Sequence, residues 1–462
     1  MTGEKAALDR ALEAVLGELH AVARGARSSG TLMVRVPAPG ADPLDLLERT
    51  SGEACDAWFW RSPDGLAFAA LGHAREILYV GPDRFWELTR AWREGLVGLA
   101  PDLPLTLCGF SFHPDGPRSE AWRPYPAGVL LLPRLLLVRS KTAAATLLLT
   151  FLAGEAPDAV LCDVTRWLAG SSSPWDLPSA MEAHPVPEPE RWKNLVRCAA
   201  EAVRGGALQK VVLARAIHLR AGGRLVAPRV LSALCARYRD CTVFGVRRAG
   251  RWFLGATPER LCRVRGGVVE TMALAGSAPR GRSEEEDRTL GRGLLESRKD
   301  REEHRIVVEY VRARLQPFTG TLEVTGPALL RTGAVQHLYS RIRGELRRPL
   351  PALQLAGVLH PTPAVAGLPL NQALRWIEQE GLDRGWYAGV LGWMDARGEG
   401  ELVVGIRSAL VAGHEAWVYA GCGILAGSDP ELEYAESELK MGPMLEALAG
   451  ASPSAVPGGV QG

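Results

Sequence analysis

The stretch TVFGVRRAGRWFLGATPERLCRVRGGVVETMA, residues 242–273, decides the fold. It contains four short runs rich in β-branched and aromatic residues, which fall into two pairs, and the turn inside each pair contains glycine. This spacing predicts one hairpin from residues 242–246 and 252–256, and a second from residues 261–264 and 268–273. Two successive hairpins indicate an antiparallel sheet.

The chain continues this pattern in both directions. A further strand is predicted at residues 210–219 (KVVLARAIHL), and a further hairpin at residues 385–395 and 401–411. Helices are predicted at residues 7–25, 192–207, 283–315 and 429–449. Hairpins with helices grouped between them predict an α+β fold with antiparallel sheets and argue against a Rossmann unit. Nucleotide binding has no support, because neither of the two glycine-rich phosphate-binding motifs lies between a strand and a helix.

Composition shifts suggest where the chain divides. Residues 170–190 (GSSSPWDLPSAMEAHPVPEPE) are rich in serine, proline and acid and form the best candidate for a linker. The residues after Gly450 have a composition typical of disorder. We therefore expect an N-terminal part at residues 1–190, a part that carries the motifs described below at residues 191–449, and a disordered tail at residues 450–462.

Composition also argues against several classes of protein. The formal net charge of +2 offers no field that would attract nucleic acid. The most apolar runs, residues 129–138 and 143–153, are shorter than the roughly 20 residues of a bilayer span, so no membrane association is expected. The eight cysteines form no C-x-x-C pair, which argues against zinc and against a disulfide framework and favours reduced thiols in the cytoplasm.

The last predicted helix carries Glu433, Glu436 and Lys440 on one face, at positions i, i+3 and i+7. Two carboxylates so placed can share a hard cation such as Mg²⁺, and the lysine can meet a substrate anion. The alternative is a solvated face with an ion pair between Glu436 and Lys440.

Glu303 lies on or beside the apolar stripe in the second half of the helix predicted at residues 283–315. A carboxylate in that position must pair, bind a metal or stay at the rim of the core. An ion pair with Lys299 or Arg305 is the alternative to a metal site.

Lysine is rare in this chain, with six lysines among 54 basic residues, so an interior lysine asks for a chemical reason. Lys210 begins an apolar strand, where it is either a lysine that reaches solvent at the strand end or a base that can lose its proton, which arginine cannot. Glu259 follows Pro258 in a loop, where it is either paired with Arg260 or a general acid.

Two further segments favour a binding pocket. Residues 360–367 (HPTPAVAG) form a proline-punctuated loop of small residues, suited to the floor of a pocket. Gly421 and Gly423 follow an apolar strand and allow backbone to approach a ligand, although a β-bulge would also explain them.

In order and spacing, these motifs resemble those of the chorismate-utilising enzymes: isochorismate, salicylate, anthranilate and aminodeoxychorismate synthases. The resemblance covers residues 192–448 and implies a fold of two large antiparallel sheets packed as a sandwich with helices outside, to which residues 1–190 add a variable N-terminal part. The motifs that carry it are Gln209-Lys210-Val-Val-Leu-Ala-Arg215, Thr257-Pro-Glu-Arg-Leu261, Leu274-Ala-Gly-Ser277, Asp300-x-x-Glu303-His304, Val335-Gln-His-Leu338, the loop at residues 360–367, Trp386-Tyr-Ala-Gly389, Gly405-Ile-Arg-Ser408, Gly421-x-Gly-Ile424 and Ser428-x-Pro-x-x-Glu433-x-x-Glu436-x-x-x-Lys440.

The resemblance implies a role for each matching residue. Lys210 corresponds to the base that activates water for attack at C2 of chorismate, and Glu259 to the acid that protonates the departing C4 hydroxyl. Glu303, Glu436 and Glu433 correspond to a Mg²⁺ site that holds the ring carboxylate. The residues that would line the substrate pocket are Gly276, Ser277, His337, Ala364, Tyr387, Arg407, Gly421, Gly423 and Lys440.

Within the family the chain is most similar to the isochorismate synthases. Lys210 is typical of members that use water, and the small apolar loop around Ala364 is typical of isochorismate synthases, whereas salicylate synthases tend to carry threonine there. Ser277 and Cys422 depart from the residues that most relatives carry. A monomer or weak dimer without an amidotransferase subunit is expected. The alternatives are a salicylate or anthranilate-type synthase and, in another class, a non-catalytic chorismate-binding relative.

Overall fold

The computed structural model describes residues 3–24, 30–50, 55–95, 106–141, 143–169 and 181–450. Its strands pair antiparallel throughout and form one connected sheet with two branches. In the order of pairing, the first branch is β1 (Thr31–Pro37), β6 (Thr146–Leu152), β5 (Gly128–Arg139), β3 (Ala67–Leu78), β2 (Ala57–Arg61), β9 (Thr242–Arg248), β10 (Arg251–Thr257), β18 (Ser408–Ala412), β19 (Glu415–Ile424) and β8 (Lys210–Ala221), with β7 (Met181–Val186) and β15 (Gly367–Leu368) on the far edge of β8.

The second branch of the sheet also connects to strand β5. In the order of pairing it consists of β13 (Thr319–Thr332), β14 (Val335–Leu346), β12 (Val268–Pro279), β11 (Arg260–Arg265), β17 (Gly400–Val404), β16 (Val390–Met394) and β4 (Thr106–Phe110), which pairs with β5.

Strand β5 belongs to both branches. One of its edges pairs with β3, while the other pairs with β4 at residues 128–131 and with β6 at residues 135–138. The two sheets expected from the sequence are therefore continuous through β5, and they face one another across the main core.

The side chains of β2 show how the layers are separated. Trp58 and Trp60 point into the core between the two branches, whereas Ala57 and Phe59 belong to a second core on the opposite face of the same strand. The ring of Trp58 lies 6.1 Å from that of Trp386, which precedes β16 of the other branch. The alternation is that of a strand buried on both faces.

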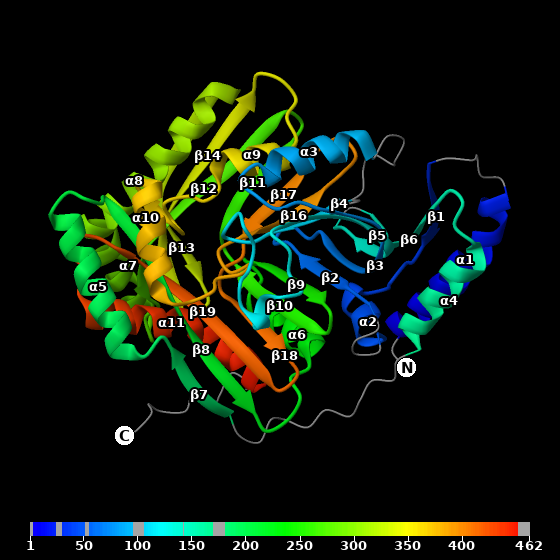
Figure 1. Cartoon of the computed structure of the whole chain (residues 1–462), viewed down its shortest axis with the longest axis horizontal. Helices are drawn as coiled ribbons and strands as arrows, with labels where there is room; N and C mark the ends of the chain where they lie inside the picture. Colours follow the sequence, from blue (N-terminus) through cyan, green and yellow to red (C-terminus); the bar gives the residue numbers. More distant parts are fainter. Residues whose placement is uncertain are drawn as a thin grey trace.

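Helices cover the outer faces at two ends of the molecule (Figure 1). At one end, α1 (Gly3–Arg24) and α4 (Pro157–Leu168) lie side by side, and α2 (Pro43–Glu48) and α6 (Ala227–Arg237) help to close the second core. The remaining helices are α3 (Arg84–Gly95), α5 (Pro189–Arg204), α7 (Glu284–Glu296), α8 (Arg298–Leu315), α9 (Ala352–Leu359), α10 (Leu370–Ile377) and α11 (Pro430–Ala449), with single 3-10 turns at Glu120–Trp122, Gln316–Phe318 and Glu378–Glu380.

Both predicted hairpins at residues 242–273 are present, as β9–β10 and β11–β12. The helix predicted at residues 283–315 is instead two helices, because the chain breaks at Ser297, whose backbone is extended and whose hydroxyl caps the second helix. The hairpin predicted at residues 385–411 is shorter than expected, since residues 385–389 form turns and, within the predicted hairpin, β16 pairs only with β17. The rest of its second arm is a separate strand, β18, which pairs with β10 and β19.

Three further predictions concern the tail and the linker, the division at residue 190, and membrane association. The tail at residues 450–462, apart from Gly450, and residues 170–180 of the predicted linker lie outside the described residues. The second half of the predicted linker is instead ordered structure, since residues 181–186 form β7, which pairs with β8, and α5 begins at Pro189. The division at residue 190 stays a prediction, although β2 pairs with β9 and β4 with β16 across it. Within the described ranges, none of the helices is long and apolar enough to cross a membrane.

Candidate active site

A cleft lies beside strand β19, against which α11 packs, and Glu303 of α8 is part of its lining. Most of the residues that the sequence predicted for a binding site line it, although they belong to nine separate motifs. These residues are Glu259, Gly276, Ser277, Glu303, His337, Ala364, Tyr387, Arg407, Gly421, Gly423 and Lys440. Apolar side chains such as Val212, Val365 and Ile406 complete the walls.

Lys210 is the first residue of β8, and its side chain is fully buried behind the lining of the cleft. Its Nζ atom is 2.9 Å from Oε1 of Glu303. It is therefore not a lysine that reaches solvent at a strand end, because a buried ammonium group depends on a partner of opposite charge.

Glu303 projects from the first half of α8, whose start is fixed by the Ser297 cap. Burial alone would raise its pKa, but Lys210, Lys440 and Lys299 together hold the pKa below its usual value. The carboxylate is thus kept in its charged form inside the protein, which is the form that binds a cation.

Glu433 and Glu436 lie on α11, which begins at Pro430 and is capped by the side chain of Asp429. Glu433 is buried and pairs with Lys299 of α8 at 2.5 Å, while Glu436 pairs with Lys440 at 2.5 Å. Burial and the neighbouring Glu436 raise the pKa of Glu433. Three lysines from three elements therefore neutralise three carboxylates at one end of the cleft.

This donor set fits a hard divalent cation. Ligand atoms of Glu433, Glu436 and Cys422 lie within 4.8 Å of one another. Glu303 does not belong to that group, but it shares the charged neighbour Lys299 with Glu433 and Glu436. Carboxylate oxygens are the ligands that Mg²⁺ prefers. A cation there would offset the repulsion between Glu433 and Glu436 that raises the pKa of Glu433.

Glu259 occupies the loop between β10 and β11 and is 5% exposed. Burial raises its pKa to about 7, although Lys210 and Lys440 are near enough to oppose this shift. The backbone of the loop is held by β17, since the amide of Val404 donates to the carbonyl of Glu259. A carboxyl group that carries a proton near neutral pH can act as a general acid.

The imidazole of His337 is hydrogen-bonded to Ser277 through one ring nitrogen and to Arg407 through the other. An N–H of Arg407 donates to Nε2 of His337 at 3.0 Å, and Nδ1 lies 3.0 Å from the Ser277 hydroxyl. Since a guanidinium can only donate, Nε2 accepts and the imidazole is neutral. Burial, with Arg407 and Lys440, keeps the pKa of His337 well below its usual value.

At Gly421 and Gly423 the backbone of β19 lies very close to neighbouring side chains of the cleft. A Cβ atom on Gly423 would lie 2.0 Å from Oε1 of Glu303, and one on Gly421 would lie 3.0 Å from the hydroxyl of Tyr387. The Nζ atom of Lys440 donates to the carbonyl of Gly421 at 3.0 Å. These contacts favour close approach to a ligand, as opposed to a bulge, as the reason for the two glycines, since β19 pairs with β8 without a register shift.

Some partners differ from those that sequence spacing suggested. Glu303 pairs with Lys210 and not with Lys299 or Arg305, because Lys299 reaches Glu433 on another helix. Arg260 pairs with Glu401 at 2.8 Å and leaves Glu259 without an ion pair among the described residues. Of the ion pairs that sequence spacing suggested for these glutamates, the pair of Glu436 with Lys440 is the one found among the described residues.

The sequence reasoning missed two contributors to this site. Lys299 was considered only as a partner for Glu303, although the scarcity of lysine was a signal that could have found it. Arg215 is fully buried in β8, donates to the Ser437 hydroxyl at 2.6 Å and stacks over the ring of Tyr434 at 3.8 Å. It thus fixes α11 against the strand that begins with Lys210.

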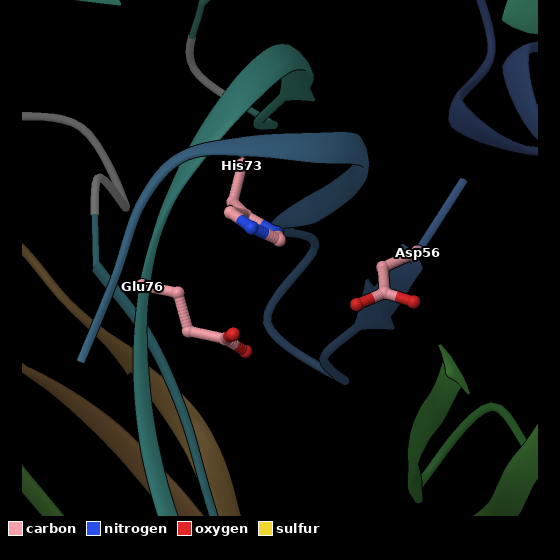
Figure 2. A group of neighbouring side chains, drawn as sticks. All are labelled: Asp56, His73 and Glu76. Carbon is pink, nitrogen blue, oxygen red and sulfur yellow. The ribbon is translucent and has the colours of Figure 1, made fainter. Parts of the chain in front are cut away.

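A second group of potential ligands, Asp56, His73 and Glu76, lies at the bend of β3 (Figure 2). Its two carboxylates already face a cation, since Arg248 is 2.7 Å from Glu76 and 3.6 Å from Asp56. We assign no metal to this group, because one guanidinium bridges both carboxylates and none of the three residues lines the cleft.

Comparison with known proteins agrees with this geometry. A family model described as chorismate binding enzyme matches residues 18–449. The chain is 38% identical over 421 residues to a salicylate biosynthesis isochorismate synthase from Pseudomonas aeruginosa, covering 88% of each protein. It is 35% identical over 353 residues to the isochorismate synthase MenF from Bacillus subtilis, covering 75% of each.

Two solved structures are similar in fold to this chain. The structure of MenF, the menaquinone-specific isochorismate synthase from Escherichia coli, matches with a TM-score of 0.80 and 29% identity, over 96% of this chain and all of that one. An anthranilate synthase component I from Streptococcus pneumoniae, 21% identical, shares the fold with a TM-score of 0.63 over 83% of this chain and 92% of that one.

Proposed function

Since this chain belongs to the chorismate binding enzyme family, we propose that it is an isochorismate synthase, an isomerase that converts chorismate to isochorismate. The observation that carries this proposal is the buried pair of Lys210 and Glu303 at one end of a cleft that also holds Glu259, whose pKa lies near 7. The site thus contains a lysine, a protonated carboxyl group and a cluster of carboxylates within electrostatic range of one another.

We assign the two proton transfers to Lys210 and Glu259. Lys210 first gives up the proton of the ammonium form that pairs with Glu303, and the neutral amine then accepts a proton from the water that attacks C2 of the ring. Glu259 donates a proton to the C4 hydroxyl as it leaves. One water is added and one is lost, while the ring double bonds shift, so the overall reaction is an isomerisation. A side chain that takes or gives a proton in the transition state acts as a general base or a general acid.

We assign Glu303, Glu436 and Glu433 as the residues that would hold Mg²⁺. Bound Mg²⁺ supplies positive charge for the ring carboxylate of the substrate. Arg407 and Lys440 offer further cationic groups along the same cleft, and Tyr387 offers a hydroxyl. A site with these groups can orient a dianionic substrate and offset the cost of its desolvation.

The proposal concerns the reaction and not one pathway. The relatives that share 35–38% identity include enzymes assigned by name to salicylate biosynthesis, to menaquinone and to vibriobactin, and all of them are called isochorismate synthases. We expect the chain to act in the cytosol as a monomer or weak dimer, in keeping with eight cysteines that are all unpaired.

The test is product analysis by chromatography after incubation of the purified chain with chorismate and Mg²⁺, with and without ammonium. We expect isochorismate as the product in both conditions. Salicylate with pyruvate, or anthranilate when ammonium is present, would assign the chain to another branch of the family. Mg²⁺-dependent chorismate binding without any product would identify a non-catalytic relative.

A further inference from the structure

Cys422 lies at the carboxylate end of the cleft but has no part in the proposed reaction. It alternates along β19 with Gly421 and Gly423, so its side chain faces α11 and not the cleft. The thiol is fully buried, and its Sγ atom donates to the backbone carbonyl of Glu433 at 3.2 Å.

The thiol and two carboxylates form a mixed set of ligands. Sγ of Cys422 and one carboxylate oxygen each from Glu433 and Glu436 lie within 4.8 Å of one another. Sulfur is a soft ligand that Mg²⁺ avoids and that Zn²⁺, Co²⁺ and Cd²⁺ accept readily.

Charge and access also favour a cation at this position. Lys299 and Lys440 now compensate Glu433 and Glu436. The side chain of Lys299 is 37% exposed, so its ammonium group can turn to water when an ion takes its place. Glu436 is 25% exposed, so one of the two carboxylates can be reached from solvent.

We propose that Cys422, Glu433 and Glu436 bind a thiophilic divalent cation, which competes with Mg²⁺ for the two glutamates. This inference rests on the metal site assigned under the proposed function. Binding forms a bond between sulfur and the metal and releases the thiol proton to water, with no change in oxidation state. The consequence is an enzyme that Zn²⁺ or Cd²⁺ inhibits through one cysteine.

The first test uses Co²⁺ as a spectroscopic probe of the full-length chain after removal of metals with a chelator. Co²⁺ bound to a thiolate absorbs in the near ultraviolet through charge transfer from sulfur. We expect a saturable band at one ion per chain, which is lost in Cys422→Ala and Cys422→Ser. Cys262→Ala is the matched control, because Cys262 is equally buried and belongs to neither group of metal ligands among the described residues.

The second test measures competition with Mg²⁺. Zn²⁺ should inhibit Mg²⁺-dependent turnover competitively with Mg²⁺, and the inhibition constant should rise by about tenfold or more in both Cys422 variants, each compared with its own uninhibited rate. Thermal unfolding of each variant establishes that it is folded.

A cobalt band that persists in folded Cys422→Ala, or Zn²⁺ inhibition equal to that of the unmodified chain, would overturn this inference. The cobalt titration needs no chorismate, so it separates the two proposals. A chain that shows the band but makes no isochorismate overturns the proposed function alone. A chain that makes isochorismate but lacks the band overturns the inference alone.

Discussion

Glu259 is a buried carboxyl group whose charge state should affect catalysis. Its pKa is raised to about 7 by burial, and the role we propose requires its protonated form. The protonated fraction falls tenfold for each pH unit above the pKa. We therefore expect kcat/KM to fall with a slope of about −1 above pH 7 in a logarithmic plot, measured from initial rates with saturating Mg²⁺. A profile that stays flat to pH 9 would remove Glu259 from the role of acid.

The same raised pKa lowers stability at high pH. A carboxyl group whose pKa is higher in the folded state stabilises the fold while it is protonated, and that contribution is lost as the pH rises through about 7. Glutamine is neutral at every pH. Glu259→Gln should thus abolish turnover and yet be more stable than the unmodified chain by about 2–3 kcal/mol at pH 8, but by less than about 1 kcal/mol at pH 5. Denaturant unfolding measures the difference, with exposed Glu323→Gln as control.

Lys210 should not tolerate replacement by arginine, although arginine keeps the charge. A guanidinium does not release its proton and cannot serve as a base. We expect Lys210→Arg to lose about 10²- to 10⁴-fold in kcat. Lys193→Arg is the control, since Lys193 forms surface ion pairs with Glu190 and Glu431. Comparable rates in both variants would contradict the assignment.

Gly423 should be replaceable by no other residue. A methyl group there would displace both Glu303 and Lys210, whose Cε atom would be 2.8 Å away. Misplacement by about 1 Å costs roughly 100-fold in rate, which we expect for Gly423→Ala in the chorismate assay. Gly427→Ala should keep its activity, because nothing lies within 4 Å of the added atom.

At the scale of single elements, hairpins could be predicted from sequence because alternation and turn residues are local signals. Strands β9 to β11 appear within two residues of their predicted bounds, whereas β12 continues six residues past its predicted end. The break between α7 and α8 was missed, since Ser297 caps the second helix inside a run that otherwise reads as helical. The partner of Lys210 was also missed, because no spacing along the chain indicates which helix lies over a strand.

Helix α11 depends on Arg215 for its position. The guanidinium of Arg215 joins β8 to Ser437 and Tyr434, on the helix that carries Glu433 and Glu436. Arg215→Met removes these contacts, and we expect it to raise the half-saturating Mg²⁺ concentration about tenfold. Arg204→Met is the control, because Arg204 is half-exposed and contacts only the exposed loop at Ala426 and a neighbouring acid. Equal Mg²⁺ dependence in both variants would show that α11 needs no such anchor.

At the scale of the whole molecule, metal binding should act on global stability. The proposed ligands come from two helices, α8 and α11, which unfolding separates, so Mg²⁺ binds the folded chain alone. At 100 times its Kd, Mg²⁺ should add about 2.7 kcal/mol to the free energy of unfolding and raise the Tm by a few degrees. A chelator should reverse the shift, and Glu303→Gln and Glu436→Gln should abolish it. A shift of the same size in both variants would place the metal elsewhere.

The sequence predicted the cleft better than it predicted the sheet. The motifs of the site include charged residues and glycines in unusual positions, which stand out in any chain. The continuity of the sheet through β5 rests on strands that are apolar on both faces, such as Gly128–Arg139, and such runs carry no signal of which neighbours they will pair with.

Because a single strand carries hydrogen bonds for both layers, the first third of the chain is structural frame for the rest. A fragment that starts after residue 190 would lose β2 and β4, and with them the bonding partners of β9 and β16. Two open edges on an apolar sheet invite pairing with other copies, so such a fragment should precipitate.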